Sequence, residues 1–209
     1  MSLKQNPSQD NVESLLDDFR LDEKTAIVTG AGRGIGRTIA LAFAEAGANV
    51  IAAARTISEI EAVVNEVTTV GRKGLAVPTD VANSEQVDSL VKRTLDTFGK
   101  VDILVNNAGL YKEVAVAPFP DKTMTTPEVM RSSATRMTDD EFNDLIQTNV
   151  SGVFYGCRAV APHMMAQRSG KIINVSSIAA EQASVLESAY QASKAAVNMF
   201  TRCISLEWA

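Results

Sequence analysis

Three polar side chains in the C-terminal part of the sequence, Ser177, Tyr190 and Lys194, have the types and spacing for proton transfer. Tyr190 follows Ser177 by thirteen residues, and Lys194 follows Tyr190 by four residues in a segment of helical composition. A spacing of four places a phenol and an ammonium on one helix face, one turn apart. A nearby ammonium favours the phenolate form of a phenol, whose reference pKa is about 10. The three residues could therefore pass a proton to a substrate oxygen, although a buried tyrosine beside a solvent-facing lysine has the same spacing.

A glycine-rich segment in the N-terminal part has the pattern of a phosphate-binding turn. Residues 25–29 form a short apolar run, glycines follow it at four positions, and apolar residues at helical spacing continue to Ala46. A strand, a glycine-rich turn and a helix N-terminus bind phosphate through backbone N–H groups and the helix dipole. Because a Cβ would hold a pyrophosphate away from the backbone, the pattern indicates a dinucleotide site formed by Gly30, Arg33, Gly34, Ile35 and Gly36.

Together with two motifs between them, these patterns make the chain similar to the short-chain dehydrogenase/reductase family. The cofactor turn of that family, Thr-Gly-x-x-x-Gly-x-Gly, is matched by Thr29 to Gly36, and its Asn-Asn-Ala-Gly motif by Asn106 to Gly109. Its catalytic residues are matched by Asn149, Ser177, Tyr190 and Lys194. The resemblance covers residues 21–209, and four ordered motifs at compatible spacings are a specific signal.

The resemblance implies a role for each of the four catalytic positions. Tyr190 would be the general acid in reduction and the base in oxidation, and Lys194 would assist it while holding the nicotinamide ribose. Ser177 would donate a hydrogen bond to the same substrate oxygen, and Asn149 would hold a water molecule that connects Lys194 to solvent. Taken singly, Ser177 also fits a strand-end cap, and Asn149 fits an amide on a helix surface.

The resemblance also implies further contacts to the coenzyme. Asp80, which follows the third expected strand, would hydrogen-bond the adenine, with an ordinary turn aspartate as the alternative. Asn107 would support the sheet and approach the cofactor. The implied contacts outside the glycine turn are Asp80, Val81, Asn107, Ala108, Gly109, Tyr190 and Lys194.

Residues after the second expected strand favour NADP(H) over NAD(H). An NAD site uses an Asp or Glu about 20 residues past the glycines to accept from the ribose 2′-hydroxyl. Here the strand ends in three alanines and Arg55 follows, with Arg33 inside the glycine turn as a second cation. Two planar, always charged guanidinium groups suit a 2′-phosphate. We therefore expect NADPH as the coenzyme, bound by Arg33 and Arg55.

The motifs predict a reaction type and leave the substrate open. The expected activity interconverts a ketone and a secondary alcohol by hydride transfer, and 3-oxoacyl-[acyl-carrier-protein] reductases are the leading specific resemblance. Sugar, polyol, steroid and small-alcohol dehydrogenases share every motif. A cofactor-binding protein without turnover is the alternative from another class, but it would be expected to have a damaged tetrad, whereas here all four residues are present.

Composition excludes several other classes of protein. The chain has 209 residues, 45% hydrophobic residues, a net charge of −5 and a pI of about 5.0, without a basic run, which argues against nucleic acid and anionic membranes as partners. No apolar stretch reaches the roughly 18 residues that span a bilayer, and residues 1–10 lack the apolar core of a secretory signal. The single histidine, His163, excludes a histidine-rich metal site, and Cys157 and Cys203 are expected to be reduced core thiols. These features predict a cytoplasmic enzyme without a metal.

The apolar pattern predicts an α/β fold with a doubly wound, Rossmann-like parallel sheet and helices on both faces. We expect strands over residues 25–29, 49–54, 74–77, 101–105 and 171–175, the last of them buried. Helices are expected up to residue 46, over 58–69, over 84–98 with Ser84 as its cap, over 142–167 after a capping box at 138–141, and around Tyr190. Residues 1–20 form a polar lead with at most a short helix over 12–19, and residues 21–209 form one domain.

Two further expectations concern the length of the chain. Residues 110–137 contain three of the six prolines and no clear periodicity, so they form an insertion that is either a substrate-side lid or a disordered surface loop. By resemblance, family members continue into two more strands, so the C-terminal strands would be missing and residues 172–175 would lie at an open sheet edge. We therefore expect a fragment of a longer enzyme, homotetrameric when complete, that is poorly soluble and inactive at this length.

Overall fold

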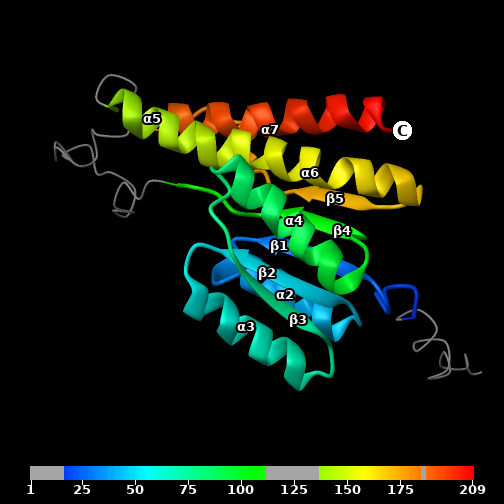
Figure 1. Cartoon of the computed structure of the whole chain (residues 1–209). Helices are drawn as coiled ribbons and strands as arrows, with labels where there is room; N and C mark the ends of the chain where they lie inside the picture. The colour runs from blue at the N-terminus through cyan, green and yellow to red at the C-terminus, as the bar shows by residue number, and fades with distance from the viewer. Residues whose placement is uncertain (1–16, 112–136, 185–186) are drawn as a thin grey trace, which may run out of the picture.

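Five parallel strands form one sheet in the part of the chain that the structure describes (Figure 1). The structure is a computed structural model that describes residues 17–111, 137–184 and 187–209. The strand order is β3-β2-β1-β4-β5, so the order reverses between β1 and β4. In chain order the elements are β1 (Thr25–Thr29), α2 (Gly34–Glu45), β2 (Asn49–Ala54), α3 (Ile57–Thr69), β3 (Gly74–Pro78), α4 (Ser84–Phe98), β4 (Ile103–Asn106), α5 (Asp139–Ile146), α6 (Gly152–Gln167), β5 (Lys171–Asn174) and α7 (Ser188–Glu207).

Alternating residues of the central strands face opposite helix layers, as the period of a strand requires. Ala26 and Val28 of β1 pack in a core with α2 and α3, whereas Ile27 packs in a second core with α4 and α6. Both faces of the inner strands are therefore dry, which explains their nearly continuous apolar sequence. The predicted doubly wound sheet with helices on both faces is confirmed.

The chain between the insertion and β5 forms one long helical stretch. Thr138 begins it with the predicted capping box, in which its side chain accepts from the Glu141 backbone and the Glu141 carboxylate accepts from its backbone N–H. A π-helical turn, Gln147–Ser151, joins α5 to α6 without a break. Helix α7 lies along this stretch, and the two pack through a small core that includes Cys157 and Val197 (Figure 1).

Several local expectations are wrong. Asn83, not Ser84, caps α4: its side chain accepts from the Gln86 backbone N–H. Strand β4 begins at Ile103, two residues later than predicted. Strand β5 is not buried, because it pairs only with β4 among the described residues, and Ile173 is 45% exposed. This position confirms the expected open edge at residues 172–175.

The remaining expectations concern cysteines, metals and membranes. Both cysteines are free, as expected, but Cys203 is exposed and only Cys157 is a core thiol. Within the described ranges, no cluster of His, Cys, Asp and Glu could hold a metal, and no helix is long and apolar enough to cross a membrane. The short helix expected over 12–19 and the insertion over 110–137 lie largely outside the described residues.

Candidate active site

The carboxyl ends of three neighbouring strands, β1, β4 and β5, lie together along one edge of the sheet. The predicted motifs follow these strand ends directly. The parallel register pairs Val28 of β1 with Val105 of β4, and Asn106 of β4 with Asn174 of β5. The glycine turn therefore begins beside the Asn107–Gly109 segment, and Ser177 follows on the other side. In open α/β sheets, ligands bind at such carboxyl ends, where the strand order reverses.

The glycine turn has the geometry of a phosphate cradle. Gly30 and Gly34 have φ of +64° and +54°, a left-handed region that disfavours residues with a Cβ. A Cβ on Gly36 would collide with the carbonyl oxygen of Gly30, so the start of α2 approaches the turn closely. Arg33 is the N-cap of α2 and makes no side-chain cap hydrogen bond. The N–H groups of the first turn of α2 are therefore not covered by a capping side chain, and a pyrophosphate fits this arrangement.

Thr29 and Asn107 hold the glycine turn against the end of β4. The hydroxyl of Thr29, which is 3% exposed, donates to the Val105 carbonyl and accepts from the backbone N–H groups of Asn107 and Ala108 at 3.0 and 3.1 Å. The Asn107 amide donates to the Thr29 carbonyl at 3.0 Å. A Cβ on Gly30 would lie 2.9 Å from both the Ala108 Cα and the Asn107 Nδ2 atoms. The Asn-Asn-Ala-Gly motif thus acts here as a structural support for the turn.

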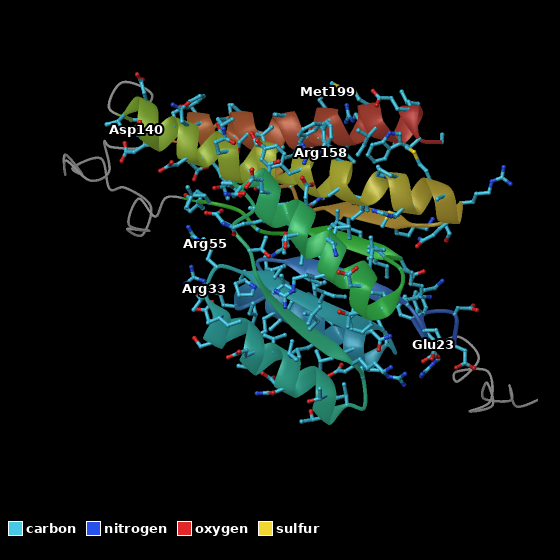
Figure 2. All side chains as sticks on the ribbon, in the orientation of Figure 1. Glu23, Arg33, Arg55, Asp140, Arg158 and Met199 are labelled. Atoms are coloured by element: carbon cyan, nitrogen blue, oxygen red, sulfur yellow. The ribbon has the colours of Figure 1, made fainter. Side chains whose placement is uncertain are left out.

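Arg33 and Arg55 lie on the same side of the molecule. Both are exposed, and Figure 2 shows them one above the other, at the left of the view where the strands end. The backbone links their segments, because the Ala31 N–H donates to the Ala53 carbonyl at 3.2 Å. Ile35, at the start of α2, is 68% exposed and offers an apolar surface beside the turn. Two cations and an apolar side chain around an open phosphate cradle suit an adenine dinucleotide with a 2′-phosphate.

Asp80 and Val81 are placed after β3 with contacts of their own. The Asp80 carboxylate accepts from the Ala82 N–H at 3.0 Å, and the Asp80 N–H donates to the Gln86 side chain at 2.8 Å. Val81 is 8% exposed, and a Cβ added to Gly152 of α6 would lie 3.0 Å from its side chain. These contacts are those of an ordinary turn that begins α4.

Lys194 is the buried cation of the site. It is 5% exposed, and its ammonium donates to the Val175 carbonyl at 2.9 Å. Burial lowers the pKa of this amine below its ordinary value. Its Nζ atom lies 5.8 Å from the centroid of the Tyr190 ring, one helical turn earlier on α7. The predicted pairing of a phenol and an ammonium on one helix face is therefore present in the structure.

Asn149 and Ser177 complete the predicted set, although each also has a structural contact. The Asn149 carboxamide accepts from the Leu110 N–H at 2.7 Å and donates to the Leu110 carbonyl at 3.0 Å and to the Ser193 hydroxyl at 3.1 Å. A Cβ on Gly109 would lie 3.6 Å from both the Asn149 Oδ1 and the Lys194 Nζ atoms, so these two side chains approach the same backbone position. Ser177 caps a 3-10 turn, Ile178–Ala180, by accepting from the Ala179 N–H.

Three polar residues near the carboxyl ends of the strands were not predicted from the sequence: Glu59, Tyr111 and Glu187. Tyr111 stacks edge-to-face on Tyr190 with a centroid distance of 4.9 Å, and its hydroxyl donates to the Glu187 carboxylate at 2.8 Å. This hydrogen bond to a carboxylate raises the pKa of Tyr111. Glu59, in the first turn of α3, reaches Gly32 in the glycine turn. None of the three belongs to a motif, so only tertiary structure brings them to the site.

The sequence is similar to those of known dehydrogenases and reductases. The sequence profile of a family described as short chain dehydrogenase matches residues 24–209. The 3-oxoacyl-[acyl-carrier-protein] reductase of Synechocystis sp. is 36% identical over 190 residues, which cover 90% of this chain and 70% of the relative. The 3-oxoacyl-[acyl-carrier-protein] reductase FabG of Staphylococcus epidermidis is 38% identical over 187 residues, covering 89% and 69%.

Solved structures with the same architecture contain different coenzymes and ligands. A 7 alpha-hydroxysteroid dehydrogenase, complexed with NADH and 7-oxo glycochenodeoxycholic acid, superposes with a TM-score of 0.78 at 33% identity, covering 92% of this chain and 68% of that one. A metagenomic short-chain oxidoreductase in complex with NADP superposes with a TM-score of 0.78 at 30% identity, covering 90% and 77%. The overall fold is therefore compatible with either coenzyme.

Proposed function

The chain belongs to the short-chain dehydrogenase family of oxidoreductases, and we propose that it interconverts a ketone and a secondary alcohol with NADP(H). The observation that carries this proposal is the pairing of the buried Lys194 ammonium with Tyr190, 5.8 Å away at the same sheet edge as the glycine turn. A bound nicotinamide would supply the hydride. The protein must then supply the proton, orient the carbonyl and hold the coenzyme.

The residues at the carboxyl ends of the strands include a candidate for each role in proton transfer. Tyr190 donates its phenolic proton to the substrate oxygen during reduction and takes it back during oxidation. Lys194 stabilises the phenolate that remains, because its positive charge is held nearby in a partly desolvated position. Ser177 donates a second hydrogen bond to the same oxygen. Asn149 keeps the Leu110 backbone and α7 in place through its three hydrogen bonds.

The coenzyme is held by the glycine turn and the two arginines. Gly30, Gly34 and Gly36 allow the pyrophosphate to approach the N-terminus of α2, and Arg33 and Arg55 bind the 2′-phosphate of NADP(H). Asp80, Val81 and the Asn107–Gly109 segment face the remainder of the coenzyme. Titration of NADPH and NADH into the protein, followed by nicotinamide fluorescence, tests this assignment. We expect NADPH to bind more tightly, and tighter binding of NADH would contradict it.

The substrate proposal is a 3-oxoacyl thioester. It is supported by the relatives named 3-oxoacyl-[acyl-carrier-protein] reductase, at 36% and 38% identity. A sugar or polyol dehydrogenase is the alternative, since a xylitol dehydrogenase structure superposes with a TM-score of 0.77 at 27% identity. NADPH oxidation by active enzyme should be measured over a panel that contains acetoacetyl thioesters, ketoses and simple ketones. Turnover of a ketose in preference to every thioester would reject the thioester proposal in favour of the alternative.

A further inference from the structure

The carboxylate of Glu59 lies against the glycine turn, a position where it would meet the coenzyme. A Cβ built on Gly32 would lie 2.6 Å from the Glu59 Oε2 atom and 2.8 Å from the Glu59 Cβ atom. Only a residue without a side chain leaves room for this carboxylate. Glu59 is partly buried and belongs to the first turn of α3, which begins just after Arg55. Three charged residues, Arg33, Arg55 and Glu59, therefore belong to the glycine turn or to the segments beside it.

These three charges are not neutralised by ion pairs within the described residues. The next charged pair along α2 and α3 is Arg37 with Glu66, whose side chains are 2.5 Å apart and bind each other. No such bond holds Glu59, Arg33 or Arg55 to a described partner. The Glu59 carboxylate can therefore accept hydrogen bonds from a ligand that binds beside the glycine turn.

Glu59 lies where its carboxylate could accept a hydrogen bond from the adenosine ribose of a bound coenzyme. In doubly wound folds, the ribose lies beside the residues that follow the second strand, and an acidic side chain there accepts from its 2′-hydroxyl. An ester phosphate at the same hydroxyl would be repelled by a carboxylate but attracted by guanidinium groups. The site thus contains attractive groups for both forms of the ribose: an acceptor from α3 and two cations from the turn and the end of β2.

We propose that Glu59 is a coenzyme-selecting residue that binds the free ribose hydroxyls of NAD(H) and weakens the preference of the site for NADP(H). This inference rests on the proposed dehydrogenase function. It predicts a protein that binds NADPH more tightly than NADH but binds both. The selection comes from α3 rather than from the end of β2, where three alanines precede Arg55.

Direct binding measurements on Glu59→Gln test the proposal without requiring turnover. Dissociation constants for NADPH and NADH are measured by nicotinamide fluorescence in the parent and the variant. Glutamine keeps the size of the side chain and removes its charge. We expect NADPH to bind about fivefold more tightly, because a repulsive charge is lost, and NADH to bind about threefold more weakly, because a charged acceptor is lost. The gain for NADPH should shrink at high salt.

Glu61→Gln is the matched control, since Glu61 lies on the same helix and is exposed, whereas Glu59 is partly buried against Gly32. It makes the same change in net charge, so any effect it shares with Glu59→Gln is a general effect of charge. Equal shifts in the two variants would overturn the role of Glu59 while leaving the proposed function intact. A parent protein that binds NADPH alone would also overturn it. A parent that binds neither coenzyme would reject the proposed function and this inference together.

Discussion

Lys194 is held in an environment that a lysine avoids unless it has a partner. Lys194 is 5% exposed, and the described residues provide its ammonium with one hydrogen bond, to the Val175 carbonyl. Burial lowers its pKa, and the cation still has donors left for a ribose hydroxyl or a phenolate. A buried cation with unused donors stabilises a fold poorly. Its position therefore fits the proposed role beside Tyr190 better than a purely stabilising role.

Replacing Tyr190 by phenylalanine tests this chemistry at the level of one oxygen atom. In active enzyme, Tyr190→Phe removes the proton donor and keeps the ring that packs on Tyr111. We expect kcat for ketone reduction to fall at least about 100-fold, the lower range of general acid–base contributions. NADPH affinity, measured by fluorescence titration, should change little. A phenylalanine variant with near-normal turnover would assign the proton to another group.

The two cysteines should differ sharply in reactivity. Cys157 is buried, and burial raises its pKa to about 11, whereas Cys203 is exposed on α7. At pH 8 a thiol with such a pKa is about one part in a thousand thiolate, the form that reacts. We expect one thiol to react quickly with an aromatic disulfide reagent in folded protein, and the second only after unfolding in denaturant. Cys203→Ser should abolish the fast phase, and a fast phase that survives this change would place a reactive thiol at Cys157.

Most elements of the fold follow from apolar spacing, and the exceptions have physical causes. The strands at 25–29 and 49–54 were predictable because their sequence is apolar on both faces and bounded by glycine or polar residues. The cap of α4 was not predictable, because Asn83 and Ser84 are both favourable N-cap residues. Only the extended backbone of Asn83 shows which of them caps the helix. The four proposed catalytic positions were located by motif. Glu59, Tyr111 and Glu187 carry no local signal, because helix packing and loop closure bring them to the site.

The π-helical turn between α5 and α6 is another feature that spacing does not reveal. Its hydrogen bonds span one residue more than those of an α-helix, and such bulges occur frequently at functional sites. Here it contains Asn149, which is fully buried and holds both polar backbone groups of Leu110. The turn therefore connects the long helix to the segment that leaves β4 beside the active site.

Asn149→Ala measures how much this connection contributes to stability. The substitution leaves the Leu110 N–H and carbonyl groups and the Ser193 hydroxyl without this partner. We expect the free energy of unfolding to fall by about 2–4 kcal/mol, because an unsatisfied buried polar group costs about 1–3 kcal/mol. The sum over three groups is reduced because the Leu110 groups are only partly buried and the Ser193 hydroxyl keeps its hydrogen bond to the Tyr190 carbonyl. Urea unfolding followed by circular dichroism gives the value. Asn143→Ala, at an exposed position of α5, is the control and should change stability by less than about 1 kcal/mol. Equal losses in both variants would show that Asn149 does not hold the segment.

The helices of the whole molecule cover the two faces of the sheet unequally. On one face, the cores place α4 and α6 over the central strands and α6 with α7 beside Ile172 of β5. On the other face, α2 and α3 pack over the inner strands, and no described residue of β5 belongs to that core, which is reached only by Val175, directly after the strand. Ile173 points to this second face and is 45% exposed. An apolar strand that is unpaired along one side is a template for association with another chain.

Ile173→Lys tests whether this edge controls the solution behaviour of the 209-residue protein. We expect the parent to form large assemblies as its concentration rises, because an exposed isoleucine and a backbone edge of β5 that pairs with no described strand both favour pairing. A lysine at position 173 places a charge beside that edge, which is how natural sheets protect their edges, so the assemblies should decrease. Light scattering and sedimentation velocity measure the size distribution. Ile57→Lys is the matched control, since Ile57 is 42% exposed on α3, away from β5, and it adds the same charge. An equal decrease in both variants would attribute association to net charge, and an unchanged distribution in Ile173→Lys would show that the edge of β5 is not the contact.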